Sequence, residues 1–494
     1  MGKHLAIDIG ADTGRAIVGW LEQDRLVMRE LHRFPTRDTS ILGKRTRNIY
    51  RWYEEIVTAL HLYVREYGSC LDSVGVNAMG HEFSLLDGDG QIIRFPMSYR
   101  DSKFGRREVN ALIEQRMGKD TVYQISGNQA MDADTFVQFL IAHENREEAF
   151  QHAKGLLFLA DTMHYLLGAR PCCEMSLASY SRLLNQRNYT WSEELFQAFD
   201  FNRKLGMPLV WAGETIGVVD RELCAQVGLE TQPWIITPCG HDTADAVVAM
   251  PDCFGSSAFI SSGTWSLLGF ETATPVISPA SCQANVSNST TGFGRNMFKK
   301  NVTGMWLVQQ CHTRWNIPYD EIVLRARQAD SMQMTIDVDA SRYMYTTRMA
   351  QAIAEDLQER YGKAVSPDDS GLLARVIYES MAMKDRYTFE KIFHAMGKTP
   401  DNIVVLGGGA QNHYLCQLIA NVMNLDVYAG HKEATAFGNL AMQLYGCGEL
   451  TSRKDVKRTA NRSVEYMRFS PQEPAVWQDR YERFLSEHVF ENLW

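Results

Sequence analysis

The chain has 494 residues, too many for one compact core at the usual size of about 150 residues per domain, so two large lobes are expected. Hydrophobic residues make up 45% and charged residues 22%, as in ordinary globular proteins, which excludes a disordered chain. The formal net charge of −9 argues against nucleic acid as a partner, and no apolar run approaches the roughly 20 residues of a membrane helix.

The first 80 residues predict a β-hairpin, a third strand, a helix and a fourth strand. The hairpin strands are residues 4–10 and 16–20, joined by a polar tip that contains Gly10 and Gly14; residues 26–34 form the third strand. Apolar residues recur every four positions within 51–67, which indicates an amphipathic helix. Residues 73–77 are the next strand, followed by a polar turn at 80–82. This order is typical of an α/β layered domain.

The segment 103–230 is mostly helical in character, including its apolar runs at 135–141 and 156–160. Residues 233–237 then predict a short strand that ends at Pro238, and 244–250 predict a helix. Asp242 therefore lies at a strand-to-helix corner, where ligands of α/β proteins collect. The residues alone leave open whether Asp242 is a catalytic carboxylate or an N-cap of the helix.

The second half repeats the opening pattern without repeating its sequence. Residues 259–268 predict a second hairpin with a polar tip at Ser261-Ser-Gly-Thr264. Residues 403–406 predict a strand that leads into Gly407-Gly-Gly-Ala-Gln-Asn412, followed by a helix at 415–422, a strand at 426–429 and a small-residue helix at 433–444. No Pro/Gly/Ser-rich linker separates the halves, so a cleft between the lobes is expected.

Three glycine-containing turns indicate phosphate or nucleotide chemistry. Glycine allows close approach of a ligand to the backbone N–H groups of a turn. Asp8 precedes the first tip and can hold Mg²⁺ or simply form the turn. Neither the dinucleotide fingerprint GxGxxG nor the GxxxxGK[ST] loop is present. The ten cysteines include no CxxC pair, which argues against a zinc site.

Six sequence blocks, taken together, resemble the FGGY carbohydrate kinase family over nearly the whole chain. The blocks are Asp8-Ile-Gly-Ala-Asp-Thr-Gly-Arg15, Tyr99-Arg-Asp101, Gly240-His-Asp-Thr243, Ser261-Ser-Gly-Thr-Trp-Ser266, Asn301-Val-Thr-Gly-Met-Trp-Leu307 and Gly407-Gly-Gly-Ala-Gln-Asn412. The resemblance implies the α/β, two-lobed actin-like ATPase (ribonuclease H-like) fold with an interlobe cleft. It places a sugar-binding lobe at 1–245 and a nucleotide-binding lobe at 246–494.

The resemblance also implies roles for individual residues. Asp242 is implied as the catalytic base and Asp8 as the Mg²⁺ ligand. The implied sugar contacts are Gly80, His81, Glu82, Arg100, His241, Thr243 and Asn301. The implied ATP contacts are Ala11, Asp12, Thr13, Gly14, Arg15, Thr264, Gln309, Gly407, Gly408 and Gly409.

Within the family the blocks are most similar to the rhamnulokinases, which implies ATP-dependent conversion of L-rhamnulose to L-rhamnulose 1-phosphate. One block departs, because rhamnulokinases carry Asp-Thr-Trp-Gly-Val-Asp where this chain has Asn77-Ala-Met-Gly-His-Glu82. Another ketose or polyol, such as L-fuculose or xylulose, is therefore an alternative substrate. A non-catalytic actin-like ATPase and a sugar-binding regulator are alternatives of another class.

The expected ligands are a small sugar, ATP and Mg²⁺, with no nucleic acid and no membrane. The expected assembly is a monomer or a homodimer. A cytoplasmic location is expected, because Asp8 interrupts the first apolar run and no leader pattern is present.

Overall fold

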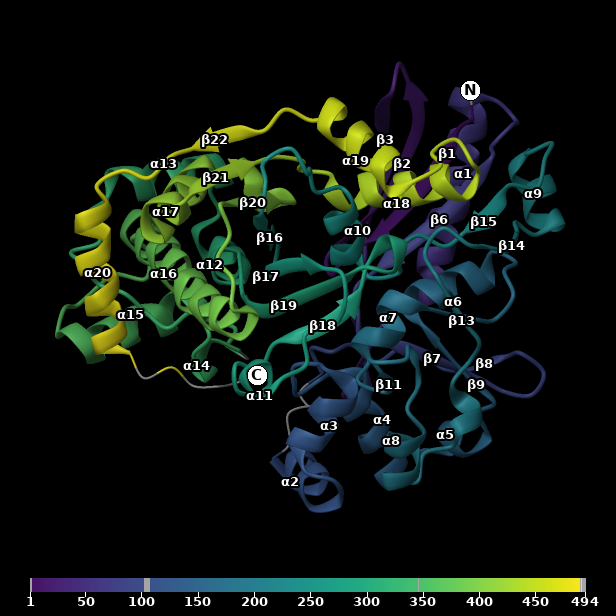
Figure 1. Cartoon of the computed structure of the whole chain (residues 1–494), viewed down its shortest axis with the longest axis horizontal. Coiled ribbons are helices and arrows are strands. Elements are labelled where there is room, and N and C mark those ends of the chain that lie inside the picture. The colour runs from purple at the N-terminus through teal and green to yellow at the C-terminus, as the bar shows by residue number, and fades with distance from the viewer. Residues whose placement is uncertain (1, 102–106, 345, 489, 491–494) are drawn as a thin grey trace. The chain divides into compact units, whose positions relative to one another are not determined.

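The computed structural model describes residues 2–101, 107–344, 346–488 and 490. The chain divides into two compact units, whose elements are labelled in Figure 1. The first unit comprises Met1–Pro251, Glu271–Phe298 and Glu433–Ser463, and the second comprises Asp252–Phe270, Lys299–Lys432 and Val464–Trp494. Each unit is therefore assembled from three separate stretches of the sequence.

A six-stranded sheet forms the centre of the first unit, with strand order β14-β15-β6-β1-β2-β3. Its strands are β1 (His4–Ile9), β2 (Thr13–Glu22), β3 (Arg25–Pro35), β6 (Ser73–Ala78), β14 (Thr215–Val218) and β15 (Trp234–Ile236). β6 is parallel to both β1 and β15, whereas the other neighbours are antiparallel. The carboxyl ends of β1, β6 and β15 therefore meet at one edge of the sheet.

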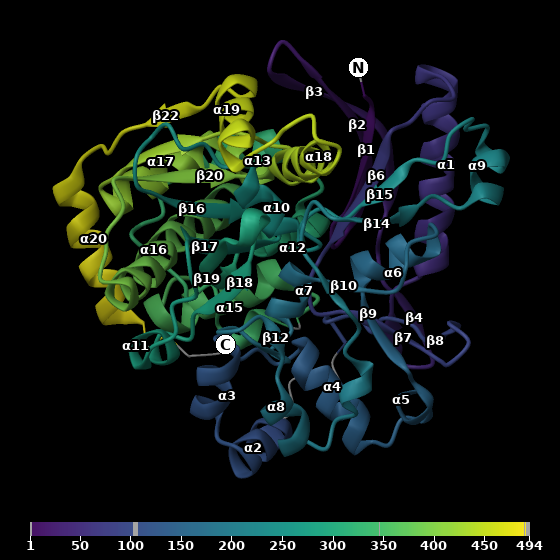
Figure 2. The same cartoon turned by 45° about the vertical axis from the view of Figure 1, so that its right-hand side comes forward.

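Helices cover both faces of this sheet. Figure 2 shows α1 (Ile49–Tyr67) on one face and α18 (Ala434–Gly446) on the other. The predicted helical spacing in α1 is confirmed, since Trp52, Ile56 and Leu60 are buried. α18 packs closely on α10 (Asp242–Val248), because a Cβ added at Gly438 would lie 2.0 Å from the Asp245 carbonyl oxygen. The small residues predicted in this helix are what allow that approach.

The rest of the first unit consists of short helices and strands. The helices are α2 (Arg107–Arg116), α3 (Lys119–Ser126), α4 (Thr135–Glu144), α5 (Glu148–His152), α6 (Leu159–Leu166), α7 (Met175–Tyr180), α8 (Glu193–Ala198), α9 (Arg221–Val227), α11 (Pro279–Gln283) and α19 (Arg453–Ser463), with 3₁₀ turns at η1 (Arg203–Leu205) and η2 (Gly292–Gly294). The strands are β4 (Thr39–Ile41), β5 (Lys44–Thr46), β7 (Phe83–Leu86), β8 (Ile92–Arg94), β9 (Gly155–Phe158), β10 (Cys173–Glu174), β11 (Leu184–Asn185), β12 (Thr190–Trp191), β13 (Leu209–Val210) and β18 (Ser287–Thr290).

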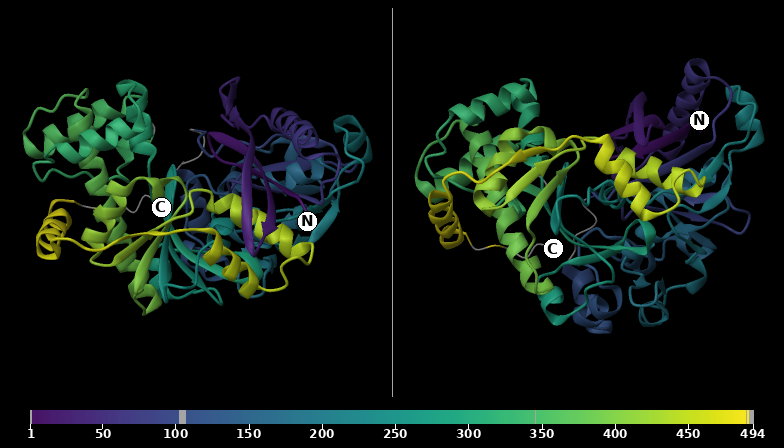
Figure 3. Two further views of the ribbon diagram at one scale, coloured as in Figure 1. Left: turned by 90° about the horizontal axis from the view of Figure 1, so that it is seen from above. Right: turned by 45° about the horizontal axis from the view of Figure 1, so that its top comes forward.

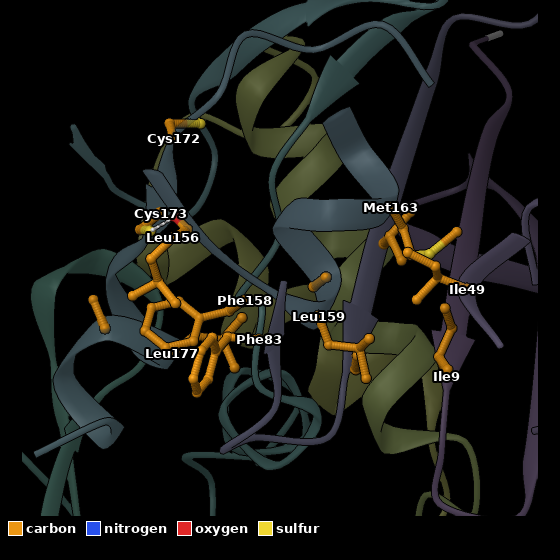
Figure 4. Packing of buried hydrophobic residues seen from close by; sticks show 14 of the residues in the cluster. Ile9, Ile49, Phe83, Leu156, Phe158, Leu159, Met163, Cys172, Cys173 and Leu177 are labelled. Atoms are coloured by element: carbon orange, nitrogen blue, oxygen red, sulfur yellow. Dashed lines mark hydrogen bonds between the residues drawn. The ribbon is translucent and has the colours of Figure 1, made fainter. Parts of the chain in front are cut away.

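The helical prediction for the run 156–160 is wrong in its first half. Residues 155–158 form β9, which pairs with β7, and α6 begins only at Leu159. Pairing with β7 gives the backbone of this apolar run its hydrogen bonds and buries both of its faces, so tertiary context decides between strand and helix. Figure 4 shows Leu156 and Phe158 packed with Phe83, and the Cys173 thiol donating to the Leu156 carbonyl at 3.3 Å. Residues 103–106 of the predicted helical segment lie outside the described residues.

The second unit contains a sheet in which β19, β17, β16, β20, β21 and β22 lie side by side in that order. These strands are β16 (Ser257–Ser262), β17 (Trp265–Thr272), β19 (Asn296–Thr303), β20 (Asn402–Leu406), β21 (Asp426–Ala429) and β22 (Met467–Phe469). The predicted hairpin at 259–268 and strands at 403–406 and 426–429 are confirmed. Because β16 is parallel to β20, with Ser261 opposite Leu406, the hairpin tip and the glycine loop lie at the same edge.

Helices drawn in green in Figure 3 make up most of the rest of the second unit. They include α12 (Trp306–Trp315), α13 (Tyr319–Gln328), α14 (Ser341–Met344), α15 (Met349–Tyr361), α16 (Ser370–Met396) and α17 (His413–Met423), with α20 (Pro474–Glu487) in yellow and a 3₁₀ turn η3 (Gly408–Gln411). α16 packs against both α13 and α17. Among the described helices of the chain, none has the length and apolarity needed to cross a bilayer.

Candidate active site

Asp8 stands at the carboxyl end of β1, and its side chain is only 7% exposed. One carboxylate oxygen accepts from Asn77 Nδ2 at 3.0 Å, and the other accepts from Arg15 Nη2 at 2.5 Å. Arg15 also forms an ion pair with Glu433. Asn77 is in turn held by Asn439 Nδ2 at 2.7 Å. The sequence signal for Asn77 was a polar residue inside an otherwise apolar strand, and its task is to orient Asp8.

The first glycine-containing tip is tightly closed. Gly10 N–H donates to the Thr13 carbonyl at 3.1 Å, and a Cβ at Gly14 would lie 2.3 Å from the ring of Phe34. The tip side chain of Asp12 is 45% exposed and pairs with Arg100 at 2.9 Å. Arg100, predicted as a sugar contact, thus lies beside the tip whose residues 11–15 were predicted to bind ATP.

The loop after β6 carries Gly80, His81 and Glu82. Glu82 is completely buried, and its carboxylate accepts from Arg47 Nε and Nη2 at 2.8 Å each and from the Tyr99 N–H at 3.1 Å. Its predicted contact with sugar stays a prediction. Nothing in the sequence pointed to Arg47, because it stands in a polar stretch without periodicity.

His81 has a positive φ of 75°, which is uncommon for residues other than glycine. Its carbonyl accepts from Thr135 Oγ1 at 3.0 Å and from Gln138 Nε2 at 3.2 Å, which fixes the loop. The His81 ring lies 4.2 Å from the ring of Tyr180, and Tyr180 lies 4.8 Å from the ring of His241. Tyr180 therefore joins two predicted sugar residues into one aromatic cluster, which no sequence pattern indicated.

Glycine is required beneath that cluster. A Cβ added at Gly80 would lie 2.8 Å from the Tyr180 ring and 3.0 Å from the His241 ring. Within residues 77–82, Gly80 is the one position that matches the rhamnulokinase pattern. It is also the position where the two rings leave no room for a side chain.

Asp242 is the first residue of α10, and His241 occupies the N-cap position without a side-chain cap. The Asp242 side chain is 33% exposed, whereas the side chains of His241 and Thr243 are buried. One carboxylate oxygen accepts from the Thr243 N–H at 2.5 Å. Asp242 is therefore an accessible carboxylate at the carboxyl edge of the sheet.

In the second unit, the hairpin tip packs on the beginning of α12. The Thr264 carbonyl accepts from the Trp306 N–H at 3.2 Å, and a Cβ at Gly304 would lie 2.7 Å from the Gly263 carbonyl oxygen. Gln309 lies one turn into α12, and its Oε1 is buried without a hydrogen-bond partner among the described residues. The structure brings together Thr264 and the start of the helix that carries Gln309.

The glycine loop lies against the same hairpin. Gly407 has φ 81°, and a Cβ at Gly409 would lie 2.0 Å from Ser262 Oγ, so both positions need glycine. A Cβ at Gly408 would meet no atom within 4 Å. The loop thus presents bare backbone with open space at its centre. Asn301, the remaining predicted sugar residue, is buried in β19 and accepts from Lys299 Nζ at 3.3 Å.

Asp8, the predicted Mg²⁺ ligand, is a carboxylate of the kind that Mg²⁺ binds. Mg²⁺ bound to a nucleotide takes one or two carboxylates and completes its shell with phosphate oxygens and water. Asp8, which stands beside the glycine tip, offers such a carboxylate. The described residues contain no cluster of three or more His, Cys, Asp or Glu side chains that could hold a metal ion.

Residues 4–249 match the N-terminal domain of the FGGY family of carbohydrate kinases, and residues 258–447 match its C-terminal domain. The chain belongs to this family. The rhamnulokinase of Bacteroides thetaiotaomicron is 32% identical to it over 484 residues, which cover 98% of each chain. The predicted family is confirmed.

Two solved structures show the same fold. A xylulose kinase from Lactobacillus acidophilus matches with a TM-score of 0.79 over 98% of this chain and 97% of its own, at 12% identity. A Plasmodium falciparum glycerol kinase matches with a TM-score of 0.76 over 99% of both chains, also at 12% identity. The predicted α/β, two-domain fold of the actin-like ATPase type is confirmed. This member of the FGGY family is an ATP-dependent sugar kinase, with a sugar and ATP as substrates.

Proposed function

We propose that the enzyme transfers the γ-phosphoryl group of ATP to O1 of L-rhamnulose and releases L-rhamnulose 1-phosphate. The observation that carries this choice of sugar is the 32% identity to a rhamnulokinase across 98% of both chains. Similarity of that extent includes the edges of both sheets where the candidate residues lie, rather than one shared motif.

The sugar residues on this proposal are those near Asp242 in the first unit. His241 and Thr243 flank the carboxylate, and the rings of His81, Tyr180 and His241 form the aromatic cluster. Aromatic faces suit the C–H surface of a sugar, and L-rhamnulose adds a methyl group that is best placed against apolar surface. Asn301 in the second unit is a further proposed sugar contact.

The nucleotide residues on this proposal are the first glycine tip, Thr264, Gln309 and Gly407–Gly409. The tips supply N–H groups and hydroxyls for phosphate oxygens, and the open space over Gly408 suits the adenosine. Mg²⁺ held near Asp8 would offset negative charge on the phosphates. Arg100 pairs with the half-exposed Asp12, and on this proposal its guanidinium also attracts an anionic ligand bound at the tip.

Phosphoryl transfer through a loose transition state needs positioning and charge neutralisation more than covalent help. An ordinary aspartate has a pKa of about 3.9, so an exposed carboxylate is ionised at neutral pH. On this proposal Asp242 orients the attacking hydroxyl and accepts its proton late, as the oxygen bonds to phosphorus.

A different ketose or polyol is the alternative that a specific observation favours. The block Asn77–Glu82 departs from the rhamnulokinase pattern, and it contributes His81 to the aromatic cluster. The test is kcat/KM for L-rhamnulose, L-fuculose, xylulose and glycerol with saturating ATP. The proposal expects L-rhamnulose to exceed every other substrate by about 10-fold or more, the scale of a few well-placed contacts. A higher value for another sugar would transfer the assignment to that sugar.

A further inference from the structure

The loop that precedes Asp242 has unusually complete side-chain support. The backbone N–H groups of residues 239, 240 and 241 each donate to a buried side chain. The acceptors are Asp245 Oδ1 for Cys239 at 3.0 Å, Glu174 Oε2 for Gly240 at 2.8 Å and Ser176 Oγ for His241 at 3.0 Å. Three consecutive amides that a surface loop would leave to water are therefore fixed by the protein itself.

Two of these acceptors act as one unit. Ser176 Oγ donates to Glu174 Oε2 at 2.5 Å, and the Ser176 N–H donates to the same oxygen at 2.8 Å. The Glu174 N–H donates to Asp161 Oδ1 at 3.1 Å, which ties the pair to α6. Both side chains are buried, and their hydrogen bonds reach the backbone of the loop before Asp242. Among the described residues, the hydrogen bonds that link this pair to the proposed chemistry go to the backbone of residues 240 and 241.

The backbone of Gly240 lies close against this part of α7 and β10. A Cβ at Gly240 would lie 2.6 Å from Leu177 Cδ1 and 3.1 Å from Glu174 Oε2. From the other side, the Gly240 carbonyl accepts from the Ala78 N–H at 2.8 Å, which ties the loop to β6. The chain is thus held on both sides immediately before the residue proposed as the base.

We propose that Ser176 and Glu174 are positioning residues for phosphoryl transfer, which hold the backbone of Gly240 and His241 and thereby set the place of the Asp242 carboxylate. The inference rests on the proposed role of Asp242. The physical reason is that a misplacement of about 1 Å at a reacting group can cost about 100-fold in rate. Asp242 is reached through a short loop, so its position depends on what fixes that loop.

Ser176→Ala tests the proposal, and Ser179→Ala is its matched control. Both serines lie on α7, both are buried, and each hydroxyl accepts one backbone N–H, from His241 for Ser176 and from Thr290 for Ser179. Only Ser176 touches the loop before Asp242. Both variants are measured for kcat, for KM of ATP and for Tm, with the best sugar of the substrate panel.

Ser176→Ala is expected to lower kcat by about 10-fold or more and to leave KM for ATP within about twofold, because the lost contact positions the base rather than the nucleotide. Ser179→Ala is expected to keep kcat within about twofold of the parent. Its Tm should fall by about as much as that of Ser176→Ala, because each variant loses one buried hydroxyl. Equal kcat in the two variants would overturn the proposal, since the loss at Ser176 would then be a general effect of a missing buried hydroxyl.

A double-mutant cycle separates this inference from the proposed function. If Ser176 acts through Asp242, adding Ser176→Ala to Asp242→Asn should change the residual kcat by less than about twofold. A full additional loss would show that Ser176 acts independently of Asp242, and the inference would fail while the base assignment stands. Near-normal kcat of Asp242→Asn alone would instead refute the base assignment on which the inference rests.

Discussion

Two aspartates three residues apart on α10 occupy opposite environments. Asp245 is fully buried, and burial raises the pKa of its carboxyl well above the ordinary value. It serves the fold by accepting from the Cys239 N–H. Asp242 is one-third exposed at the helix N-terminus. Of the two, only Asp242 is accessible to a sugar hydroxyl, which supports its assignment as the base.

Asp242→Asn is predicted to lower kcat by about 100-fold or more, the usual scale for loss of a general base. Asn keeps the size of Asp and an oxygen that can accept from the Thr243 N–H, so the free energy of unfolding should stay within about 1 kcal/mol. The measurements are kcat with saturating sugar and ATP, and a thermal melt of the same preparation.

Asp220→Asn is the control for this substitution. Asp220 is an exposed N-cap of α9 in the same unit, and its carboxylate accepts two backbone N–H groups. Its replacement should leave kcat unchanged. If Asp242→Asn turned over as fast as this control, Asp242 would have only a structural role.

Glu174 is predicted to make stability depend on pH. Burial raises the pKa of its carboxyl from 4.5 to about 7. Between these values the folded protein holds a proton that the unfolded chain has lost, so the contribution to stability is full below pH 4.5 and disappears as pH rises through about 7. Glu174→Gln has no such proton, and this contribution should vanish.

The measurement is the difference in free energy of unfolding between Glu174→Gln and the parent across this range. From acid to neutral pH the parent should lose up to about 3 kcal/mol of unfolding free energy relative to the variant. The scale is about 1.4 kcal/mol for each tenfold change in proton affinity. Asp161 and Asp245 are present in both proteins, and the variant also removes the Glu174 charge that helps to raise the pKa of each. A difference that stays constant with pH would show that Glu174 titrates near its ordinary pKa.

Among the elements, the glycine loop after β20 separates structural from binding roles. Gly409 has no room for a side chain, whereas Gly408 faces open space. Gly408→Val should therefore fold normally and raise KM for ATP by about 10-fold or more with KM for sugar within about twofold, because the side chain fills space proposed for adenosine.

Gly409→Ala provides the contrast at the neighbouring position. Its Cβ would overlap Ser262 Oγ, so it should lower Tm instead of acting on KM for ATP alone. Equal changes in the two KM values for Gly408→Val would assign the loop a purely structural role.

The loop after β6 is predicted to set the ranking of sugars through His81. Asn tolerates a positive φ, so His81→Asn should keep the loop and remove only the ring that contacts Tyr180. Relative kcat/KM values among ketoses should change by about 10-fold, while KM for ATP stays within about twofold. An unchanged ranking in a variant of normal Tm would place His81 outside the sugar site.

Elements with strong local patterns were predictable from the sequence, whereas the partners of their side chains were not. The short runs of the first 80 residues identify β1 and β6, which are buried on both faces, and the four-residue spacing identifies α1, which buries one face. β9 was not predicted, because a short apolar run is compatible with a strand and with a helix. The Arg47–Glu82 pair and Tyr180 join residues far apart in the chain, and no local spacing encodes such contacts.

For the whole molecule, the family and the order of its sequence blocks were predictable, but the composition of the units was not. The stretches Glu271–Phe298 and Glu433–Ser463 return to the first unit. α18 in the second of these stretches supplies Asn439, which holds Asn77 beside Asp8. A helix near the C-terminal end of the sequence therefore completes the environment of Asp8. Its position beside Asp8 follows from packing of α18 against the sheet and not from the order of the chain.

Hydrogen exchange across the whole chain should separate the two ligand sites. Bound ligand slows exchange where it buries or rigidifies backbone N–H groups. The sugar alone should slow exchange at residues 77–82 and 240–243, and a non-hydrolysable ATP analogue alone at 10–15, 262–264 and 407–409. Residues 221–227 of α9, which carry none of the proposed contacts, are the internal reference. Protection of 407–409 by sugar, with 240–243 unchanged, would reverse the proposed assignment of the two sites.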